Sequence, residues 1–334
     1  MSACAKRPNR SARIIHHLTN HKTAPSGAAS HLDLFEPPAR FSVLTTRGRL
    51  RTLAGTCSGP PCDGDRSRSL HCHREALMCV DDDSYPPIRP IAGGSAGSRD
   101  FRLVSADGTR FMAHAARASA PTGAGMVVIP DVRGLHPYYK ELADRFAEVG
   151  VDAVAFDFFA RTAPSDDRSE SFDFMSQVPL TKPETLQADI AAAAAYLRGS
   201  EGGGVRSLFS VGFCFGGAIS YLQAASGLGY AGVIGFYGWP NGLKRWPDRP
   251  KPVDAVSRYT CPVQSLFGGA DEGIPQIDVD AFDAACRKAG VKHDLKVYPG
   301  APHSFFDRKY AEFAEASADA WGRVQEFVRQ YTKG

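Results

Sequence analysis

The chain has 334 residues, which is long for one average domain and short for two large ones. Its composition, 43% hydrophobic and 22% charged, is typical of a water-soluble enzyme. A membrane-spanning helix needs about 20 consecutive apolar residues, and the sequence has no such run, which excludes a helical membrane protein. A net charge of +3 excludes a strongly polycationic or polyanionic chain and gives no reason to expect a nucleic-acid partner.

The charge is unevenly distributed along the chain. Residues 1–77 carry 12 of the 39 basic and 5 of the 36 acidic residues, and residues 78–334 carry the remaining 27 and 31. The basic character therefore belongs to an N-terminal segment, and the rest is mildly acidic. This second part alone is long enough to bury one core.

Residues 1–95 are predicted to form a disordered basic extension, because Ser, Gly, Pro, Arg and Thr cannot bury enough apolar surface to offset chain entropy. We favour a non-functional extension, with translation starting at Met78. Two functional interpretations stay open. One is an organelle transit peptide. The other is a zinc site, and its candidate ligands are Cys57, Cys62, Cys72, His71 and His73. Their spacing matches neither common zinc pattern.

No apolar stretch of about 7–15 residues follows the first basic residues, so no secretory signal is expected. We therefore expect a cytoplasmic protein with reduced cysteines rather than a disulfide framework.

From residue 101 the sequence alternates between strand and helix patterns. Two strands, 101–105 and 110–118, are predicted to flank a turn at Asp107-Gly108. Apolar runs over 125–130 and 151–159 predict strands buried on both faces, and the residues between them predict a helix that ends at Gly150.

The second half continues the alternation. Thr181 and Glu184 have the spacing of a capping box, which predicts the start of a helix with Leu186, Ile190 and Leu197 inward. Further strands are predicted over 206–212, 230–238, 261–269 and 293–300, and further helices over 214–226, 279–290 and 310–328.

This alternation predicts a single α/β domain over residues 96–332, with a doubly wound, mostly parallel sheet covered on both faces. In such sheets the chemistry lies beyond the carboxyl ends of the strands. Only about 20 residues separate the sixth strand from Cys261, too few for a cap domain, so a small and shallow pocket is expected.

The strongest motif is Gly-Phe-Cys-Phe-Gly over 212–216, between a predicted strand and a predicted helix. It is a G-x-C-x-G version of the nucleophile elbow, whose sharp turn exposes the central side chain. The helix N-terminus favours a thiolate at Cys214 and a developing oxyanion nearby. Two other cysteines, Cys261 and Cys286, lie in apolar stretches and are predicted to be core residues.

The α/β-hydrolase order places an acid and then a histidine after the nucleophile. Asp271 and His303 each follow a predicted strand, and they complete a Cys-His-Asp triad. Some alternatives stay open: His303 as a surface histidine, Asp271 as a turn residue, and Glu272 as the acid.

Six segments in order resemble the dienelactone hydrolase family, the cysteine-nucleophile branch of the α/β hydrolases. They are VVIPDVRG, VDAVAFDFFART, SVGFCFGGAIS, FYG, LFGGADEGIP and YPGAPHSFFDR, between about residues 101 and 330. The resemblance implies an α/β-hydrolase fold and a carboxymethylenebutenolidase-like activity. It also implies that Asp131 is the carboxylate that accepts the thiol proton, although the family has Glu there and a salt bridge to Arg133 is the alternative. The oxyanion hole would be formed by the backbone N–H groups of Val132 and Phe215.

Two positions depart from the family. The arginines that bind the substrate carboxylate in the family correspond here to Ala195 and Asp307, with Arg308 one residue further on. This difference weakens the case for an anionic substrate. Other candidates for the pocket wall follow the strand ends: His136, Tyr139, Arg161, Tyr237, Trp239, Phe305 and Arg308.

We therefore predict a monomeric hydrolase of small esters or lactones that forms a thioester acyl-enzyme and needs no metal or organic cofactor. The alternatives are a general short-chain carboxylesterase or thioesterase and a non-catalytic binding protein that keeps the fold. Its partner would be a small-molecule substrate, with no nucleic acid and no membrane.

Overall fold

Eight strands form one sheet in the computed structural model, which describes residues 83–334 except 170, 244 and 308–310. The strand order is β1-β2-β4-β3-β5-β6-β7-β8, in which β2 is antiparallel to both neighbours and all other pairs are parallel. The predicted mostly parallel, doubly wound sheet is confirmed. Met78 and the candidate zinc ligands lie outside the described residues.

The strands are β1 (Ser95–Val104), β2 (Arg110–Ala118), β3 (Ala124–Ile129), β4 (Asp152–Phe156), β5 (Ser207–Phe213), β6 (Tyr230–Phe236), β7 (Val263–Gly268) and β8 (His293–Tyr298). The α-helices are α2 (Pro137–Glu148), α3 (Phe174–Gln177), α4 (Pro183–Arg198), α5 (Phe215–Gln223), α6 (Pro252–Ala255), α7 (Gln276–Lys288) and α8 (Ala314–Tyr331). Short 3₁₀ turns are η1 (Val178–Leu180), η2 (Ser200–Gly202), η3 (Val256–Arg258) and η4 (Ala311–Phe313).

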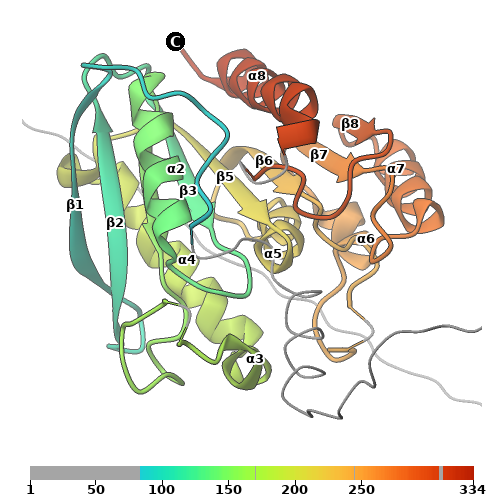
Figure 1. Ribbon diagram of the computed structural model, residues 1–334, viewed down its shortest axis with the longest axis horizontal. Helices are drawn as coiled ribbons and strands as arrows, with labels where there is room; N and C mark the ends of the chain where they lie inside the picture. The colour runs from blue at the N-terminus through green and yellow to red at the C-terminus, as the bar shows by residue number, and fades with distance from the viewer. Residues whose placement is uncertain (1–82, 170, 244, 308–310) are drawn as a thin grey trace, which may run out of the picture. The chain divides into compact units, whose positions relative to one another are not determined.

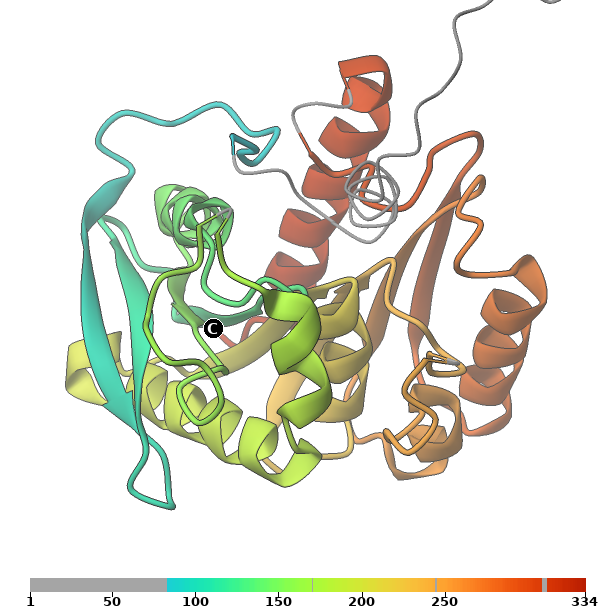
Figure 2. The same cartoon turned by 60° about the horizontal axis from the view of Figure 1, so that its bottom comes forward.

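Helices cover both faces of the sheet (Figures 1 and 2). On one face α2 and α8 touch, since the rings of Phe146 and Trp321 lie 5.0 Å apart. On the other face α4, α5 and α7 lie side by side, and the rings of Tyr221 and Phe282 join α5 to α7 at 5.1 Å. This double cover explains why every residue of β3, β4 and β5 is buried.

The hairpin at the edge of the sheet forms as predicted. Strand β1 pairs with β2 in the register Val104 to Arg110. The turn has Gly108 at φ 84°, a conformation that glycine adopts without a steric penalty. The Asp107 carboxylate accepts the Thr109 backbone N–H at 3.0 Å.

Contacts with the domain begin before the predicted boundary at residue 96. Ser84 is buried, and its hydroxyl donates to Asp307 at 2.5 Å. Ile88 packs against the core, and β1 already begins at Ser95. The contact at Ser84 depends on a residue more than 200 positions away, so no local pattern signals it.

The predicted capping box does not form. The helix begins at Pro183 with Lys182 as its N-cap, and the Thr181 hydroxyl donates instead to the Val178 carbonyl at 2.7 Å. Proline keeps the preceding residue out of the helical region, and Lys182 has an extended backbone at φ −111° and ψ 140°. A helix therefore cannot start at Thr181.

The position of the first missing family arginine and one predicted pocket residue both lie away from a substrate site. Ala195 is exposed near the end of α4, at the amino edge of the sheet, because α4 starts at the carboxyl edge and returns. Arg161 is tied down by two carboxylates: its guanidinium donates to Asp189 at 2.7 and 2.9 Å and to Asp107 at 2.8 and 3.0 Å. It joins the segment after β4 to α4 and is a structural residue.

Replacing Arg161 should therefore destabilise the fold. Arg161→Met leaves the Asp189 carboxylate, whose side chain has no exposed surface, without its counter-ion, and we expect a loss of about 3 kcal/mol in the free energy of unfolding. Asp107→Asn is the control, because it breaks the exposed half of the same network and should have little effect. Urea denaturation measures both. Equal losses would contradict the structural role of Asp189 and Arg161.

Candidate active site

The turn between β5 and α5 holds Cys214 in a strained conformation. Its φ of 55° and ψ of −116° lie outside the regions usual for a residue with a side chain. The Cys214 N–H donates to the Phe236 carbonyl at 3.0 Å, and its carbonyl accepts from Gly217 and Ala218. These bonds fix the backbone, and Cys214 becomes the N-cap of α5.

Glycines permit the close packing around this turn. A Cβ on Gly212 would overlap the Gly216 carbonyl, and a Cβ on Gly216 would overlap the carbonyl oxygens of Ile129 and Pro130. Likewise, a Cβ on Gly217 would lie 2.7 Å from the Phe236 oxygen. The predicted elbow is thus present, and it is pressed against the end of β3.

The acid and the histidine meet at the same edge of the sheet. Asp271 follows β7, His303 follows β8, and the imidazole Nδ1 lies 2.6 Å from the Asp271 carboxylate Oδ2. The other oxygen, Oδ1, accepts the Gly273 N–H at 2.8 Å. The side chain of Asp271 is fully buried, whereas the rival Glu272 is exposed, so Asp271 is the carboxylate that orients the imidazole.

Two aromatic residues after β6, both predicted as candidates for the pocket wall, pack against the His303 imidazole. The rings of Tyr237 and Trp239 each lie 4.9 Å from the His303 ring. The Trp239 indole N–H also donates to the Gly273 carbonyl at 2.9 Å, which joins it to the loop of Asp271.

Backbone strain is concentrated at this edge of the sheet. Within the described residues, three non-glycine residues have positive φ: Cys214, Tyr237 and Ser304. One is the candidate nucleophile, one packs on His303, and one follows His303 in the chain. Such strain costs of order 1–3 kcal/mol at each position and is typical of active sites.

The segment after β3 lies at the same carboxyl edge of the sheet as the other candidate site residues. Asp131 is fully buried, and its Oδ1 accepts the Arg133 backbone N–H at 2.9 Å. Val132 is buried beside it. The segment is held from β4 by Asp157, whose carboxylate accepts the Leu135 N–H and forms a bidentate pair with the buried Arg168 at 2.7 Å.

Three of the predicted pocket residues serve the framework instead. His136 is the N-cap of α2, where its Nδ1 accepts the Tyr138 N–H at 3.2 Å. Tyr139 and Phe305 have no exposed surface; Tyr139 packs on Phe213, and Phe305 packs on Tyr298. Arg308 lies outside the described residues. Asp307 is buried and bonded to Ser84, so it does not face a substrate.

A second hydrogen-bonded set of Ser, His and Asp side chains lies toward the opposite edge of the sheet. His293 bridges Asp283 at 2.9 Å and Ser265 at 2.8 Å. Ser265 has no exposed surface, and burial lowers the pKa of His293. We interpret these three residues as a buried polar network of the core, although their order along the sequence, Ser then Asp then His, matches that of a hydrolase triad.

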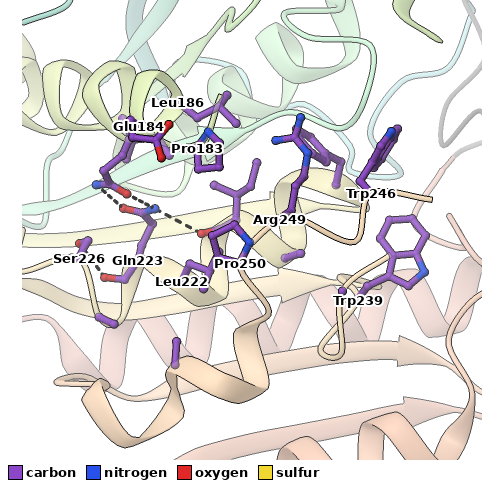
Figure 3. A pocket seen from close by; sticks show the side chains of 18 of the residues that line it. Pro183, Glu184, Leu186, Leu222, Gln223, Ser226, Trp239, Trp246, Arg249 and Pro250 are labelled. Atoms are coloured by element: carbon purple, nitrogen blue, oxygen red, sulfur yellow. Dashed lines mark hydrogen bonds between the residues drawn. The ribbon is translucent and has the colours of Figure 1, made fainter. Parts of the chain in front are cut away.

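A pocket of about 370 Å³, whose position the sequence did not indicate, lies between α4, α5 and the segment from β6 to α6 (Figure 3). Its wall includes Phe215, Ile219, Leu222, Trp246 and Arg249. The volume lies near the lower end of the usual range for small-molecule sites, as a small pocket requires, but the place of the pocket along α5 was not predicted. The apolar spacing along α5 was visible in the sequence, but the facing segments come from distant parts of the chain.

Neither a metal cluster nor a membrane span stands out in the described part of the chain. No group of three or more His, Cys, Asp or Glu side chains converges there. No helix in that part combines the length and the apolar character that crossing a bilayer requires.

The model of the dienelactone hydrolase family matches residues 111–332, from β2 to the end of α8. The chain belongs to the dienelactone hydrolase family. The matched region contains Cys214, Asp271 and His303. The family resemblance inferred from the sequence is therefore confirmed, and so is the α/β-hydrolase fold.

Several curated relatives of this member of the dienelactone hydrolase family are provisionally named carboxymethylenebutenolidase. The protein of Methylorubrum extorquens is 33% identical over 208 residues, which cover 62% of this chain and 72% of the relative. That of Escherichia coli strain K12 is 29% identical over 256 residues, which cover 74% and 94%. A crystal structure of a provisionally assigned dienelactone hydrolase from Klebsiella pneumoniae has a TM-score of 0.62 and 28% identity, covering 70% of this chain and 99% of that one.

We expect iodoacetamide to alkylate Cys214 faster than Cys261 or Cys286. Burial raises the pKa of both latter thiols to about 12, so near neutral pH they stay protonated. Cys214 lies at the N-terminus of α5, which favours the reactive thiolate. Mass spectrometry of digested peptides measures the three rates in one sample. Equal rates at the three cysteines would argue against an activated thiol.

Protonation of His136 should contribute to the pH dependence of the free energy of unfolding. Burial lowers its pKa from 6.5 to about 3, so the folded state holds it neutral. The stability it contributes is present above pH 6.5 and is lost as the pH falls, by about 2 kcal/mol between pH 6.5 and 5. His136→Asn keeps a capping acceptor and should lose less stability over that interval.

His114 provides a control of opposite sign. Its pKa is raised, because the hydrogen bonds that the ring donates to the Asp144 and Asp100 carboxylates outweigh the effect of burial. Its contribution is therefore present at low pH and is lost as the pH rises. His114→Asn should steepen the loss of stability on acidification. Urea denaturation from pH 5 to 7.5 measures both variants, and slopes equal to that of the wild type would contradict these assignments.

Proposed function

We propose that this protein hydrolyses small esters or lactones through Cys214, His303 and Asp271, with a thioester acyl-enzyme as intermediate. The observation that carries the proposal is the pairing of Asp271 with His303 at 2.6 Å, at the sheet edge where the strained elbow holds Cys214. Membership of the dienelactone hydrolase family supports the same reaction class.

The proposed reaction begins with thiolate attack. Asp131, buried at the end of β3 next to the contact with Gly216, takes the proton of the Cys214 thiol. The Sγ then adds to the substrate carbonyl carbon. The backbone N–H groups of Val132 and Phe215 hold the resulting oxyanion, and Phe215 is suited to this because the first N–H groups of a helix have no partner within it.

His303 transfers the protons in the later steps. Its Nδ1 is occupied by Asp271, so Nε2 is the nitrogen that exchanges protons. Nε2–H protonates the leaving oxygen as the C–O bond breaks, which forms the thioester. Nε2 then takes a proton from water, the hydroxide oxygen adds to the thioester carbonyl, and the C–S bond breaks to release the acid. His303 therefore enters the cycle as the imidazolium, which Asp271 stabilises, and it returns to that form when Nε2 takes the proton from water. Asp131 gives its proton back to the Cys214 thiolate that the breaking C–S bond releases.

The second candidate, a general short-chain carboxylesterase or thioesterase, is favoured by the positions of two residues. Ala195 is exposed at the far edge of the sheet, and Asp307 is buried against Ser84. Neither position therefore presents a cation to a substrate carboxylate. A non-catalytic binding protein is the remaining alternative, and the same experiment tests it.

The test compares the wild type with Cys214→Ala on a p-nitrophenyl short-chain ester, a neutral enol lactone and a carboxylated dienelactone. We expect Cys214→Ala to lose at least about 10³-fold in kcat, as expected for a nucleophile. Cys261→Ala is the matched control, because it removes a buried thiol away from the site and should keep the activity.

Each outcome of this comparison has a definite meaning. A preference for the carboxylated lactone supports a dienelactone hydrolase of the usual specificity, whereas a preference for the neutral substrates supports the general esterase. Substantial activity that survives in Cys214→Ala would overturn the assignment of the nucleophile. No turnover of any substrate, together with an unreactive Cys214, would favour the binding protein.

A further inference from the structure

The pocket beside the elbow has a wall that is mostly one face of α5. Phe215, Ala218, Ile219 and Leu222 line it, at the spacing that places side chains on the same side of a helix. Leu186 and Ile190 of α4 face them across the pocket. This surface suits an apolar ligand, because its aliphatic and aromatic groups offer no hydrogen bonds to a polar one.

One end of this pocket adjoins the candidate catalytic residues. Phe215 is the residue after Cys214, and Trp239, also in the wall, packs on His303 at 4.9 Å. Figure 3 shows Trp239 at one end of the pocket and Gln223 with Ser226 toward the other. A group bound in this pocket can therefore remain attached to a carbonyl carbon at Cys214.

Away from Trp239 the wall contains two amides that satisfy each other. The side chain of Gln187 in α4 donates to that of Gln223 at 3.2 Å, and Gln223 donates back at 3.0 Å (Figure 3). Because the two amides are hydrogen-bonded to each other, neither requires a polar group of a ligand as a partner. We expect the pair, which bridges α4 and α5, to limit the length of a group that enters from the catalytic end.

The charged side chains in the wall are used elsewhere or lie at the rim. Nη2 of Arg249 donates to the Val178 carbonyl and to the carbonyl and hydroxyl oxygens of Thr181 at 2.7–3.0 Å. Its guanidinium lies 5.0 Å from the Phe215 ring centroid. The other two charged residues of the wall, Glu184 and Arg258, are exposed. The interior of the pocket is therefore mostly apolar, and Arg249 connects the segment before α6 to the segment before α4.

We propose that this pocket holds the acyl chain of the substrate and makes the enzyme selective for neutral, apolar acyl groups of medium length. The proposal rests on the proposed ester hydrolysis. The acyl part is assigned because it stays bonded to Sγ of Cys214, from which α5 and the pocket wall continue, whereas the alcohol departs once His303 has protonated it.

The test measures kcat/KM for p-nitrophenyl acetate, butyrate, hexanoate and octanoate. Burial of one methylene favours binding enough to raise the rate about fourfold, so kcat/KM should rise by about that factor per methylene until the chain reaches the Gln187–Gln223 pair. A parallel series of acetate esters with lengthening alcohols should show no such rise. A flat acyl series, or a rise confined to the alcohol series, overturns the proposal.

Leu222→Trp fills the pocket and should lower the octanoate-to-acetate ratio of kcat/KM at least about tenfold. Val104→Trp is the matched control, since Val104 lies on the edge strand β1 and is 53% exposed; it should keep the wild-type ratio. If Leu222→Trp does not fold, Leu222→Ala replaces it, and the longer chains should then gain relative to acetate. An unchanged ratio in the folded variant overturns the proposal.

One further substrate separates an apolar from an anionic ligand. The p-nitrophenyl monoester of suberic acid has the chain length of the octanoate ester and a terminal carboxylate. We expect it to react at least about tenfold more slowly, because the carboxylate would be desolvated beside an apolar wall. A preference for the suberate ester would overturn the proposal and identify Arg249 as an anion site.

A binding measurement keeps this proposal separate from the proposed function. Octanamide is neutral and has the same chain, and it should raise the Tm of the wild type and of Val104→Trp but not that of Leu222→Trp. If no ester is hydrolysed, the proposed function fails while this shift still tests the pocket. If acetate is hydrolysed in a Cys214-dependent way with no chain-length preference and no Tm shift, the pocket proposal fails while the function stands.

Discussion

A tight backbone contact joins the elbow to the end of β3, where Gly216 lies directly against the carbonyl groups of Ile129 and Pro130. Strands β3 and β5 pair in parallel up to Ile129 and Gly212, so both chains leave the sheet at the same level. A side chain at Gly216 would force them apart. Through this contact the segment that carries Val132 lies beside the elbow that carries Cys214.

The surrounding framework holds the strained backbone in place. Asp157 and Arg168 form a buried pair that fixes the segment after β3, and His136 caps the helix that follows it. On the other side, Asp271, Trp239 and Tyr237 fix the His303 ring. These contacts position the groups around Cys214, whose own positive φ is held by its bonds to the Phe236 carbonyl of the neighbouring strand and to the first turn of α5.

The distribution of charge around the site has a consequence for substrate choice. The charged side chains near the carboxyl edge mostly pair with each other, as Arg161 does with Asp189 and Asp107. Arg249 stays in the pocket wall but is occupied by backbone oxygens. What the pocket offers to a ligand is therefore apolar surface along α5, which agrees with an enzyme that selects by shape and hydrophobic contact.

The sequence alone determined the fold class, the hairpin at Asp107-Gly108 and the identity of the elbow, because glycine spacing and buried apolar runs are local consequences of backbone sterics and burial. It also singled out Asp271 and His303, since the order of strand ends along the chain predicts which side chains share an edge. It could not separate Arg161, His136, Tyr139 and Phe305 from true pocket residues, because all follow strand ends or catalytic motifs and differ only in what they touch. Those contacts, the displaced start of α4 and the pocket between α4 and α5 depend on residues far apart in the chain, and only the tertiary packing of the helices on the sheet brings them together.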